Sequence, residues 1–113
     1  MSDQSSKVLE ALYDTLVARK TADPASSYVA QLHSRGIDSI LKKIGEEAAE
    51  TLIAAKNEDK AELVHELADL WFHTLVLAAH REIPVQAILD ELARRSGRSG
   101  LEEKASRDIT RGR

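Results

Sequence analysis

The chain has few residues that interrupt or cross-link a fold. Its 113 residues include no cysteine, two prolines and five glycines. The absence of cysteine excludes disulfides and thiolate metal sites. Strand-like alternation of apolar and polar residues is also missing, whereas Ala, Leu, Glu and Lys, which favour helix, are abundant. The sequence therefore predicts an all-α domain.

Large charge and long apolar runs are absent too. The net charge is −3, which gives no sign of a nucleic-acid-binding surface. No apolar run approaches the length of a membrane span, and the first residues, "MSDQSSK", lack the apolar stretch of a signal peptide. We therefore expect a cytoplasmic protein with neither a nucleic acid nor a membrane as partner. A chain of this length fits one domain with a modest core, which a second subunit would complete.

Helix boundaries can be placed from capping and breaking residues. Pro24 breaks the first helix, and Gly36 is a common type of helix stop. Asp59 is a candidate cap, with Glu62 three residues later as in a capping box. We expect residues 1–95 to form the domain and residues 96–113 a basic tail. The expected helices span about Ser6 to Lys20, Ser27 to Ser34, Asp38 or Ser39 to Asn57, Lys60 to His80, and Pro84 to Arg95.

Acidic residues recur at helical spacing in two successive helices. The stretch "KKIGEEAAETLIAAK" carries Glu46, Glu47 and Glu50, and "HELADLWFH" carries Glu66 and Asp69. The short turn between these helices predicts an antiparallel hairpin. Glu50 and Glu66 lie eight residues from its centre, so they should face each other. Glu47 and Asp69 lie eleven residues from it and should face each other about 4.5 Å further along.

A solvated acidic face is the alternative interpretation of this pattern. Like charges three or four residues apart on one helix cost a few tenths of a kcal/mol. Close carboxylate pairs across the hairpin would repel by about 3–4 kcal/mol at an effective dielectric constant of 20. A bound cation removes this repulsion, and carboxylates, waters and phosphates are the ligands that Mg²⁺ prefers. The combined pattern predicts a Mg²⁺ site that also accepts Mn²⁺.

Histidine ligands are a weaker prediction. His65 and His73 lie four residues on either side of Asp69, and Glu62 with His65 forms an E-x-x-H sequence. Di-iron helical bundles use this sequence twice, but it occurs only once here. Di-iron chemistry is therefore an alternative that lacks half of its ligands.

Four other side chains are assigned by the environment that we expect for them. His33 and His80 are expected on the surface. Trp71 and Phe72 are expected in the core or at a subunit contact, with base stacking as the alternative.

Several stretches together resemble a known family. E-E-x-x-E followed by E-x-x-D resembles the all-α nucleotide pyrophosphohydrolases, which are MazG-like. "SSYVAQLHSRGIDSILKKIGEEAAE", "HELADLWFHTLVLA" and "RSGLEEKASR" resemble, more narrowly, the phosphoribosyl-ATP pyrophosphatase family of histidine biosynthesis. The resemblance extends from about Val8 to Arg107.

This resemblance implies a reaction in which phosphoribosyl-ATP and water give phosphoribosyl-AMP and pyrophosphate, with Mg²⁺ as cofactor. It implies that Glu47, Glu50, Glu66 and Asp69 are metal ligands and that Glu46 is an accessory catalytic carboxylate. It also implies a homodimer or a larger homo-oligomer, with the helical bundle built from two chains.

Basic side chains are needed to meet the phosphates, although each alone is more often a solvated surface charge. The tail is expected to close over the phosphates, with a plain solvated tail as the alternative. The candidates for phosphate contact are Lys42, Lys43, Arg94, Arg95, Arg98, Lys104 and Arg107.

Two other functions remain open at the level of sequence. One is a pyrophosphohydrolase of another nucleoside triphosphate or of dUTP, because the phosphate-handling residues are shared. The other is a non-catalytic helical dimerisation module, which would tolerate Glu50→Gln and would not depend on magnesium.

Overall fold

The computed structural model describes residues 3–96 and residue 104. All regular secondary structure in this part of the chain is helical, which confirms the all-α prediction. None of its helices is long and apolar enough to cross a membrane. The elements are α1 (Asp3–Ala18), the 3-10 helix η1 (Arg19–Thr21), α2 (Tyr28–Arg35), α3 (Ile37–Lys56), α4 (Lys60–His80) and α5 (Val85–Arg95).

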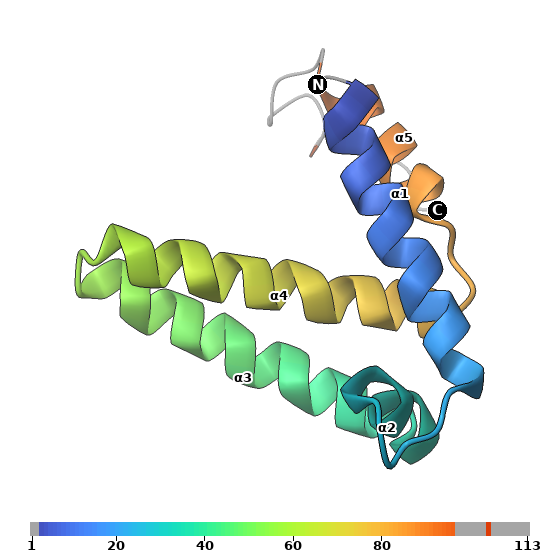
Figure 1. Ribbon diagram of the computed structural model, residues 1–113. Helices are drawn as coiled ribbons and strands as arrows, with labels where there is room; N and C mark the ends of the chain where they lie inside the picture. The colour runs from blue at the N-terminus through green and yellow to red at the C-terminus, as the bar shows by residue number, and fades with distance from the viewer. Residues whose placement is uncertain (1–2, 97–103, 105–113) are drawn as a thin grey trace.

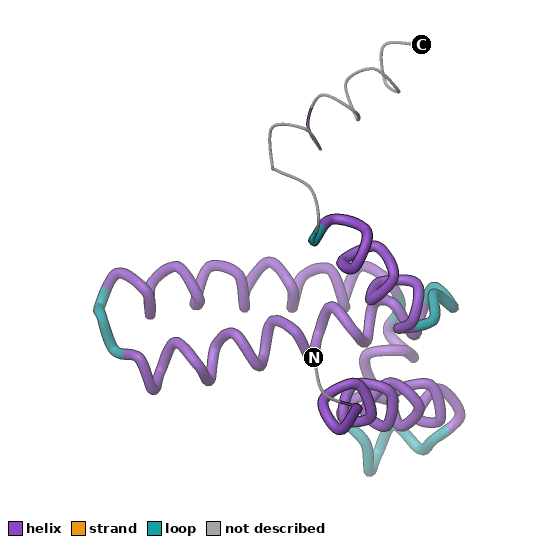
Figure 2. The backbone as a smooth tube through the Cα atoms, turned by 90° about the horizontal axis from the view of Figure 1, so that it is seen from above, coloured by secondary structure: helices purple, strands orange, loops and turns teal. Residues whose placement is uncertain are grey.

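The two longest helices, α3 and α4, form the predicted antiparallel hairpin (Figure 1). Helix α2 packs against α3, and α1 packs against α4 and α5. These three helices gather at the end of the hairpin away from its turn, so the turn end projects alone (Figures 1 and 2). The described part of the chain is therefore a hairpin that is covered over only part of its length.

Side-chain caps start two of the helices. The Ser27 hydroxyl accepts the backbone N–H of Ala30 at 3.1 Å at the start of α2. The Asp59 carboxylate accepts the backbone N–H of Glu62 at 3.1 Å at the start of α4, as predicted. Each bond satisfies one of the donors that the first turn of a helix leaves unpaired.

The predicted start of α3 was wrong. Neither Asp38 nor Ser39 is the cap, because α3 begins at Ile37 directly after Gly36. Gly36 has a φ of 98° and ends α2 as well, so one residue serves both helices. Glycine tolerates this positive φ without the penalty that a Cβ would bring. The first helix also begins earlier than expected, at Asp3.

The buried core lies where α1, α2 and α5 meet the covered end of the hairpin. Phe72 packs against this core, as expected, whereas Trp71 is 62% exposed and lies outside it, so a subunit contact stays the prediction for Trp71. Both residues lie on α4, and adjacent helical positions point about 100° apart, so they lie on different sides of the helix. The core residues are Leu16, Val29, Leu32, Ile40, Leu75, Val76, Ala79 and Val85.

The expectation of a surface His33 was also wrong. His33 is only 9% exposed and stacks on His80, with ring centroids 5.2 Å apart. Its Nε2 lies 3.1 Å from the carbonyl oxygen of Leu16, so Nε2 carries the proton and donates it. Its Nδ1 lies 3.0 Å from Nδ1 of His80 and therefore accepts from that atom. Neutral His33 thus joins α1, α2 and α4.

This pairing predicts acid sensitivity. Burial lowers the pKa of His33, so the unfolded chain binds a proton at a higher pH than the folded chain does. The contribution of neutral His33 to stability is present above about pH 6.5 and is lost as pH falls. Chemical denaturation at a series of pH values measures this. As pH falls from 7.5 to 5.5, the free energy of unfolding of the unmodified chain should decrease more than that of His33→Gln. Equal decreases in the two proteins would contradict this prediction.

Candidate functional site

Most of the predicted acidic residues lie together where α3 faces α4. Glu47, Glu50 and Glu66 bring carboxylate oxygens within 4.8 Å of one another. The ligand atoms of His65, Glu66 and Asp69 also lie within 4.8 Å of one another. Glu66 belongs to both groups, and we call the carboxylates of Glu47, Glu50, Glu66 and Asp69 the acidic cluster. Glu46 is exposed and belongs to neither group of ligand atoms.

Two carboxylates of the acidic cluster are buried with unpaired oxygens. Glu47 is 5% exposed and Glu66 is 6% exposed. The Oε2 atom of each has no hydrogen-bond partner among the described residues. Buried polar atoms in native proteins nearly always have a partner, and a buried charge without one is costly. The donor set, carboxylate oxygens with two acceptors unsatisfied, fits a hard divalent cation such as Mg²⁺.

A threonine holds the two helices of the site in register. The Thr51 hydroxyl donates to the backbone carbonyl of Glu47 at 2.8 Å within α3. The same hydroxyl lies 3.4 Å from the carbonyl of Glu66 on α4. A small residue that contacts both backbones allows the helices to approach closely, and this brings the buried carboxylates together.

Crowding of the carboxylates changes their titration. Burial raises the pKa of Glu66 to about 7, and neighbouring Glu50, Glu62 and Glu47 add to the rise. Glu66 therefore carries a proton for much of the time near neutral pH when no cation is present. This proton relieves part of the repulsion within the acidic cluster.

This pKa predicts how the metal-free protein responds to pH. The folded chain holds a proton on Glu66 that the unfolded chain has already released, so stability is lost as pH rises through about 7. With a chelator present, the melting temperature of the unmodified chain should fall relative to Glu66→Gln between pH 5.5 and 8.5. Glu10→Gln, an exposed change on α1, should run parallel to the unmodified chain. A difference in melting temperature between the unmodified chain and Glu66→Gln that stays constant across this pH range would refute the raised pKa.

Glu62 was missed as a member of this site. Its backbone N–H completes one half of the predicted capping box, but its carboxylate lies beside Glu66 and raises the pKa of Glu66. Glu62 also lines an open cavity of about 400 Å³ together with Glu50 and Glu66. Its spacing of four residues from Glu66 was the available signal, because such residues share one helix face.

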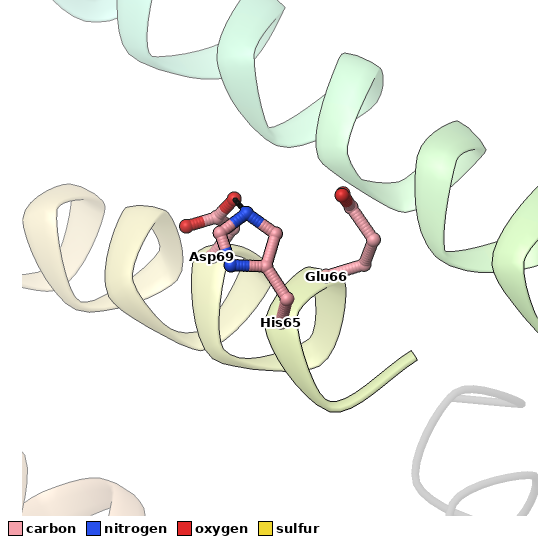
Figure 3. Close-up of side chains that lie close together, drawn as sticks. All are labelled: His65, Glu66 and Asp69. Carbon is pink, nitrogen blue, oxygen red and sulfur yellow. Dashed lines mark ion pairs between the residues drawn. The ribbon is translucent and has the colours of Figure 1, made fainter. Parts of the chain in front are cut away.

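The second group of ligand atoms contains an imidazole. His65 Nε2 lies 3.3 Å from Asp69 Oδ2, while Glu66 extends toward α3 (Figure 3). The His65 side chain is 66% exposed, so this contact is largely solvated. His73, the other candidate histidine, is 5% exposed and belongs to neither group of ligand atoms.

Tyr28 and His73 form the wall of the site on the side of α2. His73 Nδ1 lies 2.8 Å from the carbonyl oxygen of Asp69 and must donate to it. His73 Nε2 therefore accepts the Tyr28 hydroxyl proton at 2.7 Å. Burial raises the pKa of Tyr28, with Lys43, Glu47 and Asp69 among its charged neighbours. Tyr28 was not identified from its sequence environment as a site residue.

The basic candidates differ in their surroundings. Lys43 Nζ lies 3.5 Å from Glu47 Oε1, whereas Lys42 is exposed. Arg94 and Arg95 are engaged with Glu91 on α5, and they lower the pKa of Glu91 to about 2. Arg98 and Arg107 lie outside the described residues, as does most of the tail. Lys104, which the structure does describe, is helical and exposed.

The hairpin and its acidic cluster define a class of protein. Carboxylates from E-E-x-x-E on one helix meet those from E-x-x-D on the next, which is the arrangement expected of an all-α nucleotide pyrophosphohydrolase. The family model described as "Phosphoribosyl-ATP pyrophosphohydrolase" matches residues 9–96. The chain belongs to the phosphoribosyl-ATP pyrophosphohydrolase family.

Curated relatives are similar in sequence to this chain over nearly their whole length. A protein of Neisseria gonorrhoeae named phosphoribosyl-ATP pyrophosphatase is 55% identical over 100 residues, covering 88% of this chain and 94% of the relative. A protein of Chromobacterium violaceum with the same name is 56% identical over 103 residues, covering 91% and 95%. One of Methylococcus capsulatus, also so named, is 54% identical over 102 residues, covering 90% and 97%.

Proposed function

We propose that the chain hydrolyses phosphoribosyl-ATP to phosphoribosyl-AMP and pyrophosphate, the second step of histidine biosynthesis. The observation that carries this proposal is the acidic cluster in a chain of this family, where two buried carboxylate oxygens have no partner among the residues that the structure describes. Relatives more than 50% identical bear the name of that enzyme. A biosynthetic reaction on a small nucleotide fits a cytoplasmic location.

The acidic cluster is proposed to hold Mg²⁺ or Mn²⁺. Glu47, Glu50 and Glu66 supply converging carboxylate oxygens. A carboxylate oxygen of Asp69 lies within 4.8 Å of one of Glu66. When bound, such an ion neutralises phosphate charge, orients the phosphates and lowers the pKa of a bound water. Glu46, exposed on the same helical turn, is proposed to accept a hydrogen bond from the attacking water.

The remaining residues act on the substrate and the water. The water oxygen attacks phosphorus, the bond between the first and second phosphates of the triphosphate breaks, and pyrophosphate leaves. Lys43 lies beside Glu47, which supports a role for Lys43 in meeting phosphate oxygens, and exposed Lys42 is proposed as a second contact. Ammonium groups compensate the charge that develops on the leaving pyrophosphate.

The direct test is turnover of phosphoribosyl-ATP by the purified full chain with Mg²⁺. We expect equimolar pyrophosphate and phosphoribosyl-AMP, and a kcat/KM at least a hundredfold above that for ATP or dUTP. Preference for a free nucleoside triphosphate would reassign the substrate. A folded, metal-binding protein that hydrolyses none of the three would support a non-catalytic role.

We further propose a homodimer formed through the uncovered half of the hairpin. On α4, Val64 is 67% exposed and Trp71 is 62% exposed, with Leu67 between them at helical spacing. On α3, Leu52 and Ile53 are 69% and 60% exposed. Apolar residues in such number on two adjacent helices are typical of a subunit interface. A second hairpin packed there would complete a helical bundle.

A charge placed among these exposed apolar residues tests the proposed dimer. Val64→Glu should convert a dimer into a monomer at micromolar concentration, because the carboxylate would be buried without a partner at the interface. Ile83→Glu, which replaces an exposed apolar residue outside the hairpin, should leave the dimer intact. Light scattering after size exclusion measures both. A monomeric unmodified chain, or a dimeric Val64→Glu, would contradict the proposed interface.

A further inference from the structure

Lys43 is the one lysine or arginine paired with the acidic cluster in the part of the chain that the structure describes. Its Nζ lies 3.5 Å from Glu47 Oε1. The Glu47 side chain is 7% exposed, whereas that of Lys43 is 33% exposed. The other oxygen of Glu47 has no hydrogen-bond partner within residues 3–96 or from Lys104. The ammonium thus supplies positive charge to a buried carboxylate and remains partly open to solvent.

This ion pair is weakly built for a permanent structural role. Lys43 precedes Glu47 by four residues, which is the less favourable order for an ion pair on a helix. The separation of 3.5 Å is long for a charge-assisted hydrogen bond, which usually measures about 2.7–2.9 Å. The lysine stem has several rotatable bonds, so its ammonium can leave Glu47 at little cost.

Helix α2 contributes a second polar group, the Tyr28 hydroxyl, to the surroundings of Lys43. Tyr28 is the largest cause of the raised pKa of Lys43, and Lys43 and Glu47 are in turn among the charged neighbours of Tyr28. The Tyr28 proton is directed at His73 Nε2, so the lone pairs of the Tyr28 oxygen remain as acceptors. Lys43 therefore pairs with a buried carboxylate, and the group with the largest effect on its pKa is a hydroxyl that keeps free acceptor lone pairs.

We propose that Lys43 is an internal counter-cation that compensates Glu47 in the metal-free protein and turns to the polyphosphate when a divalent cation binds. Binding of the cation and of the polyphosphate would then be positively coupled. This inference rests on the proposed function, since it takes the acidic cluster to be the metal site.

The coupling follows from charge. A divalent cation on Glu47 repels the ammonium 3.5 Å from the same carboxylate, so Lys43 weakens binding of the metal alone. A polyphosphate supplies anionic oxygens to both the divalent cation and the Lys43 ammonium. Its attraction to each of them outweighs the repulsion between them. Each ligand therefore raises the affinity for the other by the same factor, as thermodynamic linkage requires.

Calorimetry with Mn²⁺ alone and with Mn²⁺ plus inorganic pyrophosphate, corrected for the complex that they form in solution, measures this coupling. Lys43→Met should bind Mn²⁺ alone at least threefold more tightly than the unmodified chain. The factor by which pyrophosphate raises Mn²⁺ affinity should fall at least tenfold. Lys43→Arg, which keeps the charge, should retain both properties, and Lys56→Met, an exposed change on α3, should leave both within twofold.

The outcomes separate this inference from the proposed function. Unchanged or weaker Mn²⁺ binding by a folded Lys43→Met would overturn the counter-cation role, even if phosphoribosyl-ATP were hydrolysed. If the Mn²⁺ and pyrophosphate affinities change as expected but the unmodified chain does not hydrolyse phosphoribosyl-ATP, the role of Lys43 is supported and the proposed substrate is rejected. Failure of the unmodified chain to bind Mn²⁺, with or without pyrophosphate, would overturn both.

Discussion

Glu50→Gln should lower kcat/KM for phosphoribosyl-ATP about a thousandfold, the equivalent of about 4 kcal/mol of transition-state stabilisation. Glu50 shares a 4.8 Å group of carboxylate oxygens with Glu47 and Glu66. An amide keeps the shape of the side chain but removes the charge that a divalent cation needs. The loss should appear in initial rates of pyrophosphate release at saturating Mg²⁺.

The same substitution should not unfold the protein. Glu50 is exposed and lies beside Glu66, so removal of its charge relieves repulsion in the metal-free protein. The melting temperature of Glu50→Gln without metal should therefore equal or exceed that of the unmodified chain. Glu58→Gln, an exposed change at the turn of the hairpin, is the matched control and should retain full activity. Undiminished turnover by Glu50→Gln would remove the acidic cluster from the mechanism.

Removal of divalent cations should abolish turnover altogether. A chelator should reduce pyrophosphate release to background, because the acidic cluster without a cation repels the triphosphate. Mg²⁺ or Mn²⁺ should restore the rate, since both favour oxygen ligands. Each ion should also raise the melting temperature, because it binds the folded chain and not the unfolded one.

Two controls sharpen this experiment. Ca²⁺ tests whether charge alone suffices, because it takes oxygen ligands but requires a larger and more flexible coordination sphere than Mg²⁺ does. The Glu50→Gln protein should show a smaller rise in melting temperature with Mg²⁺ than the unmodified chain does. Full activity in the presence of a chelator would exclude a metal-dependent mechanism.

Local features of the sequence determined the helices and the hairpin. Pro24, Gly36 and Asp59 mark boundaries because their effects depend on the backbone of one turn. The short connection between α3 and α4 made an antiparallel pairing the expected result, so the facing of Glu50 and Glu66 could be predicted from their distance to the turn. The family resemblance, which rests on residue identities alone, also required no coordinates.

Only the tertiary structure decided which groups are buried and which partners they meet. His33 is enclosed because its side chain on α2 meets His80 on α4 and the carbonyl of Leu16 on α1, and these contacts depend on packing between distant segments. Tyr28 reaches His73, 45 residues away, for the same reason. The pKa of Glu66 depends on how much water the neighbouring helix removes. Periodicity assigns a side chain to one face of a helix, but the environment of that face is determined by helices elsewhere in the sequence.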